Sequence, residues 1–483
     1  MSDSKINIKA TSSLLWSGVE QFGSQGLSLV ITIVIARLIN PADYGLIAML
    51  SIFMAISQVF INCGFSNYLI QNKNRTTQDF STVFFLNVSI GIVCYLILYF
   101  CADSIARFYN QPILSKIIKY YSIVLVISSL TLVQRAKLYI DYKFKKLSLI
   151  TIISLIVAGS IAILMALKGY GVWTLVAYQI IQTFSVSFLI WITTNWHPDF
   201  NFSRTCAKKA FNFGSKLLGA NLLSNGVANL YTLVIGKKFQ VTELGFYSRG
   251  QSLSAVFPSN FANMLQQATY PVLCELQDNT VELKRMFCNY MTMATMICFP
   301  IMAILLGIAE PLVQLILTDK WLPAVPFLQI LSVAYMFDPI MRLNTIILSV
   351  TGKTQLSLYS EILKKSILVA ILFISLPFGI VWVAISTIIY SVCDIVVVSF
   401  FVRKIIPLSL IDEIKITVPY LFFSATIGGL CILVNLIPCA SFIKIFIAIL
   451  ISVCVYMALI KNFKRPQYDF AAEHLQKIFR KNG

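Results

Sequence analysis

Residues 22–45 read FGSQGLSLVITIVIARLINPADYG, and residues 222–245 read LLSNGVANLYTLVIGKKFQVTELG. At a constant offset of 200 and without a gap, six residues recur: Ser24, Gly26, Thr32, Val34, Ile35 and Gly45 return as Ser224, Gly226, Thr232, Val234, Ile235 and Gly245. Chemically related residues keep the same offset: Arg37 with Lys237, and Asp43 with Glu243. Apolar matches alone arise easily by chance, but paired basic, acidic and glycine positions do not. An internal repeat in a very apolar chain is typical of transporters built from two similar halves.

The composition indicates an all-α protein that crosses a membrane many times. The chain is 58% hydrophobic and 12% charged, against roughly 45–50% and 25% in soluble domains. Its apolar residues come in runs of about 20, the length of a membrane-spanning helix. The net charge of +18 does not indicate nucleic-acid binding, because the basic residues are spread over many short loops, as orientation in a membrane requires.

The sequence predicts no metal site, no cofactor and no enzymatic activity. Its eleven cysteines form no CxxC motif and lie mostly in apolar runs, which favours free thiols that pack as small apolar groups. Both histidines, His197 and His474, fall in expected loops or tails. The first apolar run starts near Thr11 and is too long for a signal-peptide core, so we expect it to be a permanent helix.

We expect about fourteen transmembrane helices. They cover residues 11–36, 43–70, 80–101, 116–135, 147–167, 171–194, 213–236, 250–274, 287–308, 324–350, 357–377, 379–402, 416–437 and 442–460. Lys and Arg concentrate in alternate loops, such as 135–146 and 204–209, and in the tail 461–481. These loops and both termini are therefore expected in the cytoplasm.

The repeat predicts two pseudo-symmetric six-helix lobes of the same orientation. A second match supports this division: Leu147-Ser148-Leu149 and Trp173 recur at an offset of 209 as Leu356-Ser357-Leu358 and Trp382. The expected organisation is a first lobe at 1–194, a cytoplasmic linker at 195–212, a second lobe at 213–405, helices 13 and 14 at 406–460, and a basic tail at 461–483. Six spans are an even number, so an axis along the membrane normal should relate the lobes.

An ordered set of short motifs over residues 10–405 resembles one transporter family. The set includes Ala36-Arg37-Leu38 with Pro41 and Asp43-Tyr44-Gly45, then Gln134-Arg135-Ala136, Phe213-Gly214, Leu244-Gly245 and Tyr270-Pro271. The chain resembles the Wzx-type polysaccharide exporters of the MOP superfamily, in the branch that includes the colanic acid exporter. The second turn, KKFQVTELG, departs from the ARLLxPxDFG pattern of the first.

The resemblance implies a flippase in the bacterial inner membrane. Its substrate would be an oligosaccharide repeat unit on undecaprenyl pyrophosphate, moved to the periplasmic leaflet for O-antigen, capsule or exopolysaccharide synthesis. It also raises a polysaccharide polymerase as a further partner. The alternatives are an ion-coupled small-molecule or multidrug antiporter of the same superfamily, a membrane enzyme, and another two-lobed carrier with twelve helices. The short outside loops count against an enzyme.

Charged residues inside the spans are candidate functional residues, because a charge in the bilayer is costly and usually faces a cavity or a partner. Arg249 begins span eight, while Lys216 and Arg342 lie within spans seven and ten. By resemblance, such flippases have a cationic cavity between the lobes, where guanidinium groups suit a pyrophosphate. We therefore assign Arg249, Lys216 and Arg342 to substrate binding.

Other charges are candidates for gating or for ion coupling. Arg37 with Asp43 and Lys237 with Glu243 flank equivalent periplasmic turns, and Glu20 lies at a depth similar to that of Lys216. Each of the two turn pairs is read either as an outer gate or as a local structural ion pair. Glu20 and Lys216 are read as an inter-lobe salt bridge at the inner rim or as groups that admit a phosphate head group. Candidates for a coupling-ion site are Asp394, Asp338 and Glu361. For Asp338, a local pair with Arg342 at i,i+4 is the alternative, and for Glu361 it is a cluster with Lys364 and Lys365.

Overall fold

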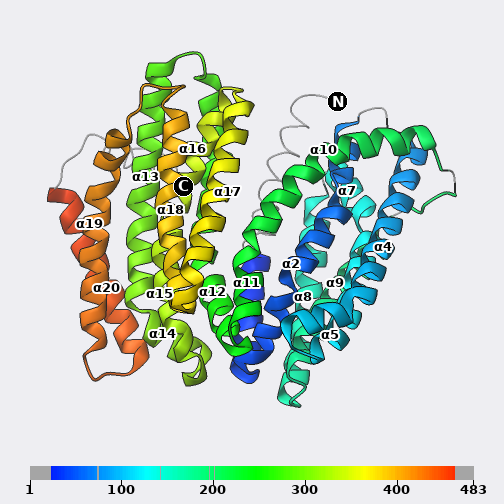
Figure 1. Cartoon of the computed structure of the whole chain (residues 1–483), viewed down its shortest axis with the longest axis horizontal. Coiled ribbons are helices and arrows are strands. Elements are labelled where there is room, and N and C mark those ends of the chain that lie inside the picture. The colour runs from blue at the N-terminus through cyan, green and yellow to red at the C-terminus, as the bar shows by residue number, and fades with distance from the viewer. Residues whose placement is uncertain (1–22, 73–74, 142, 195, 201, 463–483) are drawn as a thin grey trace. The chain divides into compact units, whose positions relative to one another are not determined.

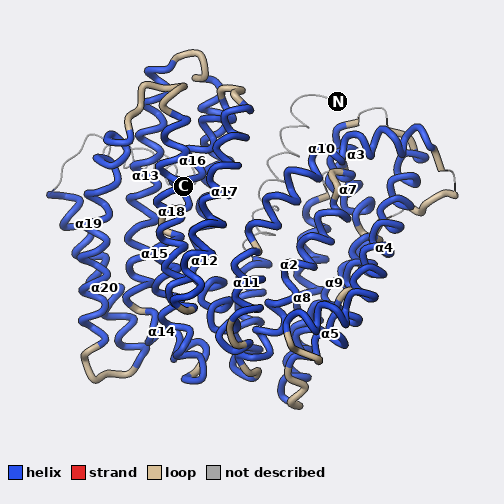
Figure 2. The backbone as a smooth tube through the Cα atoms, in the orientation of Figure 1, coloured by secondary structure: helices blue, strands red, loops and turns tan. Residues whose placement is uncertain are grey.

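The computed structural model describes residues 23–72, 75–141, 143–194, 196–200 and 202–462. These residues form helices and no strand, as Figure 2 shows. The chain divides into two compact units, Met1–Gly245 and Phe246–Gly483. An apolar helix at Gly23–Leu38 opens the described part of the first unit.

The rest of the described part of the first unit contains ten helices of very different length (Figure 1). They are α2 (Pro41–Asn62), α3 (Phe65–Gln71), α4 (Thr77–Tyr109), α5 (Ile113–Tyr121), α6 (Ile123–Ser129), α7 (Leu132–Ile140), α8 (Phe144–Leu167), α9 (Val172–Thr193), α10 (Arg204–Ala228) and α11 (Leu230–Lys238). Helix α12 (Val241–Glu275) begins in the first unit and continues in the second.

The second unit continues with a further set of helices. They are α13 (Thr280–Gly307), α14 (Ala309–Leu317), α15 (Val325–Tyr335), α16 (Asp338–Val350), α17 (Thr354–Ser375), α18 (Ile380–Val402), α19 (Leu410–Asn435) and α20 (Ser441–Asn462), with short 3₁₀ turns at Asp319–Ala324 and Leu376–Phe378.

Ten helical stretches of the described chain are long and apolar enough to cross a membrane, which makes this a multi-pass membrane protein. They are Pro41–Gln71, Thr77–Tyr109, Ile113–Ile140, Phe144–Leu167, Val172–Thr193, Thr280–Gly307, Asp319–Val350, Ile380–Val402, Leu410–Asn435 and Ser441–Lys461. Each corresponds to one of the expected spans. Many large apolar side chains are exposed on these helices. Such surfaces suit contact with lipid, whereas soluble proteins rarely expose large apolar patches to water.

The other four expected spans are less apolar or only partly described. Residues 213–236 and 250–274 are helical in α10, α11 and α12, but polar residues interrupt them. The span at 357–377 lies on α17, which carries three charged residues: Glu361, Lys364 and Lys365. The first span, 11–36, is described only from Gly23. The count of fourteen spans and the arrangement in six-helix lobes therefore stay predictions.

Two expected spans are interrupted in the structure, and one of the interruptions has a local cause in the sequence. The span 116–135 is built from α5, α6 and α7, which are joined at Ser122 and at 130–131. The span 324–350 breaks at 336–337, and Pro339 stands in the first turn of α16, where the missing N–H of proline costs nothing. Between α2 and α3, Gly64 has φ 68°, a left-handed conformation that glycine adopts without strain.

Each unit has its own apolar core. In the first unit, α8 packs along α9, α4 packs on α5 and α6, and α2 contacts α10 and α11. Phe65, Phe80 and Phe84 form a cluster there with Trp196. In the second unit, α13 packs along α19, and α18 packs against α15, α16 and α17.

Candidate functional site

The two copies of the repeat meet at two glycines. A Cβ atom built on Gly45 would lie 1.9 Å from the carbonyl oxygen of Val241, and one built on Gly245 would lie 2.0 Å from the carbonyl oxygen of Pro41. Only glycine permits backbones to approach so closely. At the repeat offset of 200, Pro41 is equivalent to Val241 and Gly45 to Gly245. The first turns of α2 and α12 therefore cross in a reciprocal, two-fold manner.

The charged residues beside this crossing have identifiable neighbours. Arg37 is exposed, and Asp43 lies half-buried in the first turn of α2, where it faces Gly171 at the start of α9. The ammonium of Lys237 donates to the carbonyl oxygen of Phe108 and lies 4.6 Å from the centre of its ring. Glu243 accepts a 3.0 Å hydrogen bond from the backbone N–H of Gln240 and so caps α12.

Lys237 and Glu243 thus contact different groups, and no ion pair joins them in the described part of the chain. Their role as a gate stays a prediction, as does that of Arg37 and Asp43. Glu20 lies outside the described residues. Lys216 lies on α10, but its side chain is outside the described part of the chain, so the expected pairing of these two residues also stays a prediction.

The two candidate arginines of the second unit differ in their surroundings. Arg249 lies on α12 and is only 6% exposed. Arg342 lies on α16, where its Nε is 3.3 Å from Oδ2 of Asp338 and its Nη1 donates to Oδ1 of Asn263 at 3.1 Å. The structure therefore brings together Arg342 and Asp338, two residues that the sequence assigned to different roles.

The carboxylates of Glu361 and Asp394 share one ammonium group. The Nζ atom of Lys364 is 2.5 Å from Oε1 of Glu361 and 3.4 Å from Oδ2 of Asp394. Tyr390 donates its hydroxyl to the same Asp394 oxygen at 3.1 Å. Lys364 and Asp394 are each 5% exposed. Because Lys364 already supplies the positive charge, a coupling cation at these carboxylates would have to displace the lysine.

One buried acid was missed by the sequence analysis. Glu413 on α19 is 2% exposed, and its Oε2 accepts a 3.2 Å hydrogen bond from Nδ2 of Asn344 on α16. The expected span began at residue 416, which left Glu413 in a loop. A signal was present: Ser409 and Asp412 have the spacing of a helix-capping box, and the structure forms that box at the start of α19.

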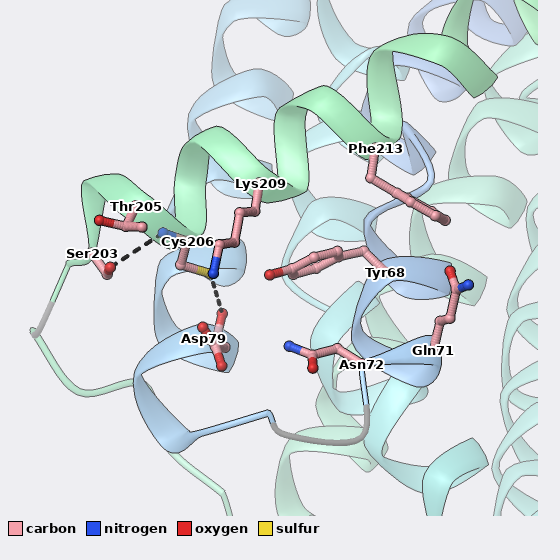
Figure 3. Close-up of a pocket in the computed structure, with 9 residues that line it drawn as sticks. All are labelled: Tyr68, Gln71, Asn72, Asp79, Ser203, Thr205, Cys206, Lys209 and Phe213. Atoms are coloured by element: carbon pink, nitrogen blue, oxygen red, sulfur yellow. Dashed lines mark hydrogen bonds between the residues drawn. The ribbon is translucent and has the colours of Figure 1, made fainter.

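A polar cavity of about 520 Å³ lies at one end of the first unit, between α3, α4 and α10 (Figure 3). Its walls include Tyr68, Asp79, Cys206 and Lys209. Burial, and then the nearby Asp79, raise the pKa of the Cys206 thiol to about 12. The thiol is therefore neutral at physiological pH, and Lys209 is the cavity's one basic group among residues that the structure describes.

The described part of the expected linker, residues 196–200 and 202–212, is held by hydrogen bonds beside this cavity. The backbone N–H of Asp199 donates to Oγ of Ser81 at 3.0 Å, and that of Ser203 donates to Oγ1 of Thr82 at the same distance. Ser203 in turn accepts from the N–H of Cys206 and caps α10, as Figure 3 shows. The linker thus forms a wall of the cavity rather than a free connection.

The amino-acid sequence is similar to those of several known proteins. The chain is 24% identical to the teichuronic acid biosynthesis protein TuaB of Bacillus subtilis (strain 168), over 63% of this chain and 63% of that protein. It is 25% identical to the lipopolysaccharide biosynthesis protein WzxC of Escherichia coli (strain K12), over 67% and 66%. The matches therefore span just under two thirds of these relatives' lengths. For the succinoglycan biosynthesis transport protein ExoT of Rhizobium meliloti (strain 1021), the identity is 21% over 68% and 67%.

A solved structure shares the fold. The lipid II flippase MurJ, in an inward closed conformation, superposes with a TM-score of 0.72 at 16% identity, covering 93% of this chain and 98% of that one. A model of the family described as polysaccharide biosynthesis protein matches residues 34–326, more than half of the chain. The resemblance to Wzx-type polysaccharide exporters is thereby confirmed, and the chain belongs to this family of polysaccharide biosynthesis proteins.

Proposed function

We propose that this protein is a flippase for undecaprenyl-pyrophosphate-linked oligosaccharide repeat units. It moves them from the cytoplasmic to the periplasmic leaflet of a bacterial inner membrane, for O-antigen, capsule or exopolysaccharide synthesis. One observation carries the proposal: a chain of this family has the fold of a lipid II flippase over 93% of its length. A relative named as a succinoglycan transport protein supports the same role.

A saccharide headgroup needs a polar path through the bilayer, because its hydroxyl and phosphate groups lose their hydration in hydrocarbon. Helix α12 is suited to such a path. Asn263, Gln266 and Gln267 line a cavity of about 420 Å³ with Tyr270. Arg249 lies on the same helix, about four turns before the first of these amides. Helix α12 can therefore offer both a cation and neutral hydrogen-bonding groups to one substrate.

Substrate binding in this proposal uses Arg249, Lys216 and Arg342. A guanidinium group presents parallel N–H donors that match two oxygens of a phosphate. Arg342 is held by Asp338 and Asn263, which fixes its orientation before the substrate arrives. The three carboxylates Asp338, Asp394 and Glu361 are the proposed coupling sites. Each lies within 3.5 Å of a basic side chain, so coupling would act by loosening these pairs.

Alternating access would use the repeat. The reciprocal contact of Gly45 and Gly245 gives α2 and α12 a common crossing point, and Arg37, Asp43, Lys237 and Glu243 flank it as an outer gate. In this scheme both termini are cytoplasmic. A site that binds the headgroup equally well on both sides only speeds equilibration, so net transport needs a difference in affinity or removal of the product outside.

The decisive experiment measures lipid-linked saccharides on each side of the membrane in a deletion strain. We expect intact repeat units to accumulate on the cytoplasmic face, and the wild-type gene to clear them. Arg249→Ala should fail to clear them, while Arg403→Ala, which removes an exposed arginine at the end of α18, should succeed. Clearance by Arg249→Ala would keep the function and refute the site. Normal surface polysaccharide without accumulation would favour the antiporter.

A further inference from the structure

A second polar cavity lies wholly inside the first unit, between α2, α6, α7 and α9. It has a volume of about 470 Å³, within the range of roughly 300–1,000 Å³ that small-molecule sites occupy. Four side-chain amides line it, together with several hydroxyl groups: the amides belong to Gln58, Asn62, Gln179 and Gln182. These residues come from spans that are otherwise strongly apolar. Such a concentration of amides inside a membrane helix bundle calls for a polar occupant.

The amides of this cavity are available to a ligand. The side chains of Asn62, Gln179 and Gln182 have no hydrogen-bond partner among the described residues, and Gln58 has one long contact, 3.5 Å from Oγ of Ser128. An amide offers two N–H donors and a carbonyl acceptor. Several amides around one space therefore match a ligand with many hydroxyl groups, each of which both donates and accepts.

Among the described residues that line the cavity, Arg135 alone is charged. No lining residue is acidic, and no salt bridge in the described part of the chain involves Arg135. The Nε atom of Arg135 is buried and lacks a hydrogen-bond partner. A guanidinium without a counter-charge, in a largely apolar bundle, is best satisfied by an oxyanion that accepts its N–H groups.

Arg135 lies on α7, whose start is joined to α9 by a hydrogen bond. Its backbone N–H donates to the carbonyl oxygen of Thr131 at 2.9 Å. Just before α7, the carbonyl oxygen of Leu130 accepts a 3.2 Å hydrogen bond from the indole of Trp191 on α9. This bond ties the start of α7 to the helix that carries Gln179 and Gln182. Arg135 and the two amides therefore line one cavity on helices that this bond joins.

We propose that this cavity is a saccharide site that holds a sugar unit bearing an oxyanion. The amides bind the sugar hydroxyls, and Arg135 binds the oxyanion, which is either the carboxylate of an acidic sugar or a phosphate attached to the sugar. The proposed flippase function is needed only to say that this sugar arrives on a lipid carrier. Asn62, Ser66 and Arg135 stand toward the span ends that the charge pattern places on the cytoplasmic side, where such a substrate would enter.

The test is ligand binding by the purified full-length protein in lipid nanodiscs, followed by saturation-transfer difference NMR. The probes are glucose, glucuronic acid and glucose 1-phosphate. We expect at least one of the two anionic sugars to bind about tenfold more tightly than glucose. Preference for glucuronic acid would assign Arg135 to an acidic sugar, and preference for glucose 1-phosphate would assign it to a sugar phosphate. Equal binding of all three would overturn the proposal.

Two variants locate the effect. Arg135→Gln should abolish the preference for the anionic sugar and leave weak glucose binding. Lys137→Gln removes the same charge from the same helix, but outside the cavity lining, and should bind like the wild type. If Arg135→Gln keeps the preference while Lys137→Gln loses it, the site is wrong. Circular dichroism and elution profiles of both variants confirm that each is folded.

Failure of this site and failure of the proposed function give different results. If the wild type binds anionic sugars through Arg135 but its deletion causes no lipid-linked saccharide to accumulate, the site stands and the flippase function fails. If accumulation occurs and Arg135→Gln binds all three sugars like the wild type, the function stands and the site fails.

Discussion

Gly45 and Gly245 each lie against the backbone of the other's helix: the carbonyl oxygen of Val241 covers Gly45, and that of Pro41 covers Gly245. The two residues are equivalent in the internal repeat, so each contact is a copy of the other. The contact between the first turns of α2 and α12 is therefore reciprocal. Few positions of the chain are so strictly limited to one residue type.

A methyl group at either glycine should destabilise this crossing. Gly45→Ala and Gly245→Ala each place a Cβ about 2 Å from a carbonyl oxygen, and backbone cannot move aside as a flexible side chain can. We expect each variant to lose about 1–3 kcal/mol of stability, the usual cost of overpacking. Thermal unfolding of the detergent-solubilised protein measures the loss. Gly429→Ala, where an added Cβ meets no atom within 4 Å, should unfold at or slightly above the wild-type temperature.

The expected topology can be checked with a native cysteine. Cys439 is exposed in the turn between α19 and α20, and an even number of spans with cytoplasmic termini places this turn in the periplasm. In a variant whose other cysteines are replaced by serine or alanine, a membrane-impermeant maleimide should label Cys439 in intact cells. Labelling only after the inner membrane is permeabilised would invert the proposed orientation.

The thiol of Cys206 should react slowly and in a strongly pH-dependent way. Its pKa is raised from 9.0 to about 12 by burial and by Asp79, and only the thiolate is nucleophilic. At pH 8 it should therefore hold about a thousandfold less thiolate than an ordinary cysteine. In single-cysteine variants of the purified protein, the rate of alkylation of Cys206 by iodoacetamide should still rise about tenfold from pH 9 to pH 10. As a control, the rate for an exposed cysteine introduced by Thr205→Cys should level off over the same range. Identical pH profiles for the two cysteines would contradict the raised pKa.

Much of the fold could be predicted from the sequence because membrane spans are set by local hydrophobicity. Every one of the ten apolar stretches matches an expected span. Breaks within spans were harder to place: the joint between α15 and α16 at 336–337 falls just before Pro339, but nothing local marks the joint between α5 and α6 at Ser122. Such short breaks depend on packing, which a hydrophobic pattern does not record.

The candidate site was predictable only where the partners are close in sequence. Asp338 and Arg342 are four residues apart and form the local pair that their spacing offered as the alternative. By contrast, Phe108 accepts from Lys237 across 129 residues, and no repeat or spacing indicates that contact. The amides of Gln58 and Gln179 stand in different apolar spans, where single polar residues look incidental. Their convergence on one cavity with Arg135 appears only when the helices are assembled.

The ammonium of Lys364 should be essential to the stability of the second unit. It balances Glu361 on its own helix and the buried Asp394 on α18, so Lys364→Met leaves an uncompensated buried carboxylate, at a cost of about 3–5 kcal/mol. The double variant Lys364→Met/Asp394→Asn removes both buried charges and should recover most of that loss. Lys365→Met, with no ion pair in the described structure, should unfold like the wild type. Thermal unfolding in detergent measures the stability of all three variants. A Lys364→Met protein as stable as Lys365→Met would show that the ion pairs of Lys364 contribute nothing to stability.

If instead both Lys364→Met and the double variant are stable but inactive in clearing lipid-linked saccharide, the cluster serves transport rather than folding, as the coupling proposal for Asp394 and Glu361 requires.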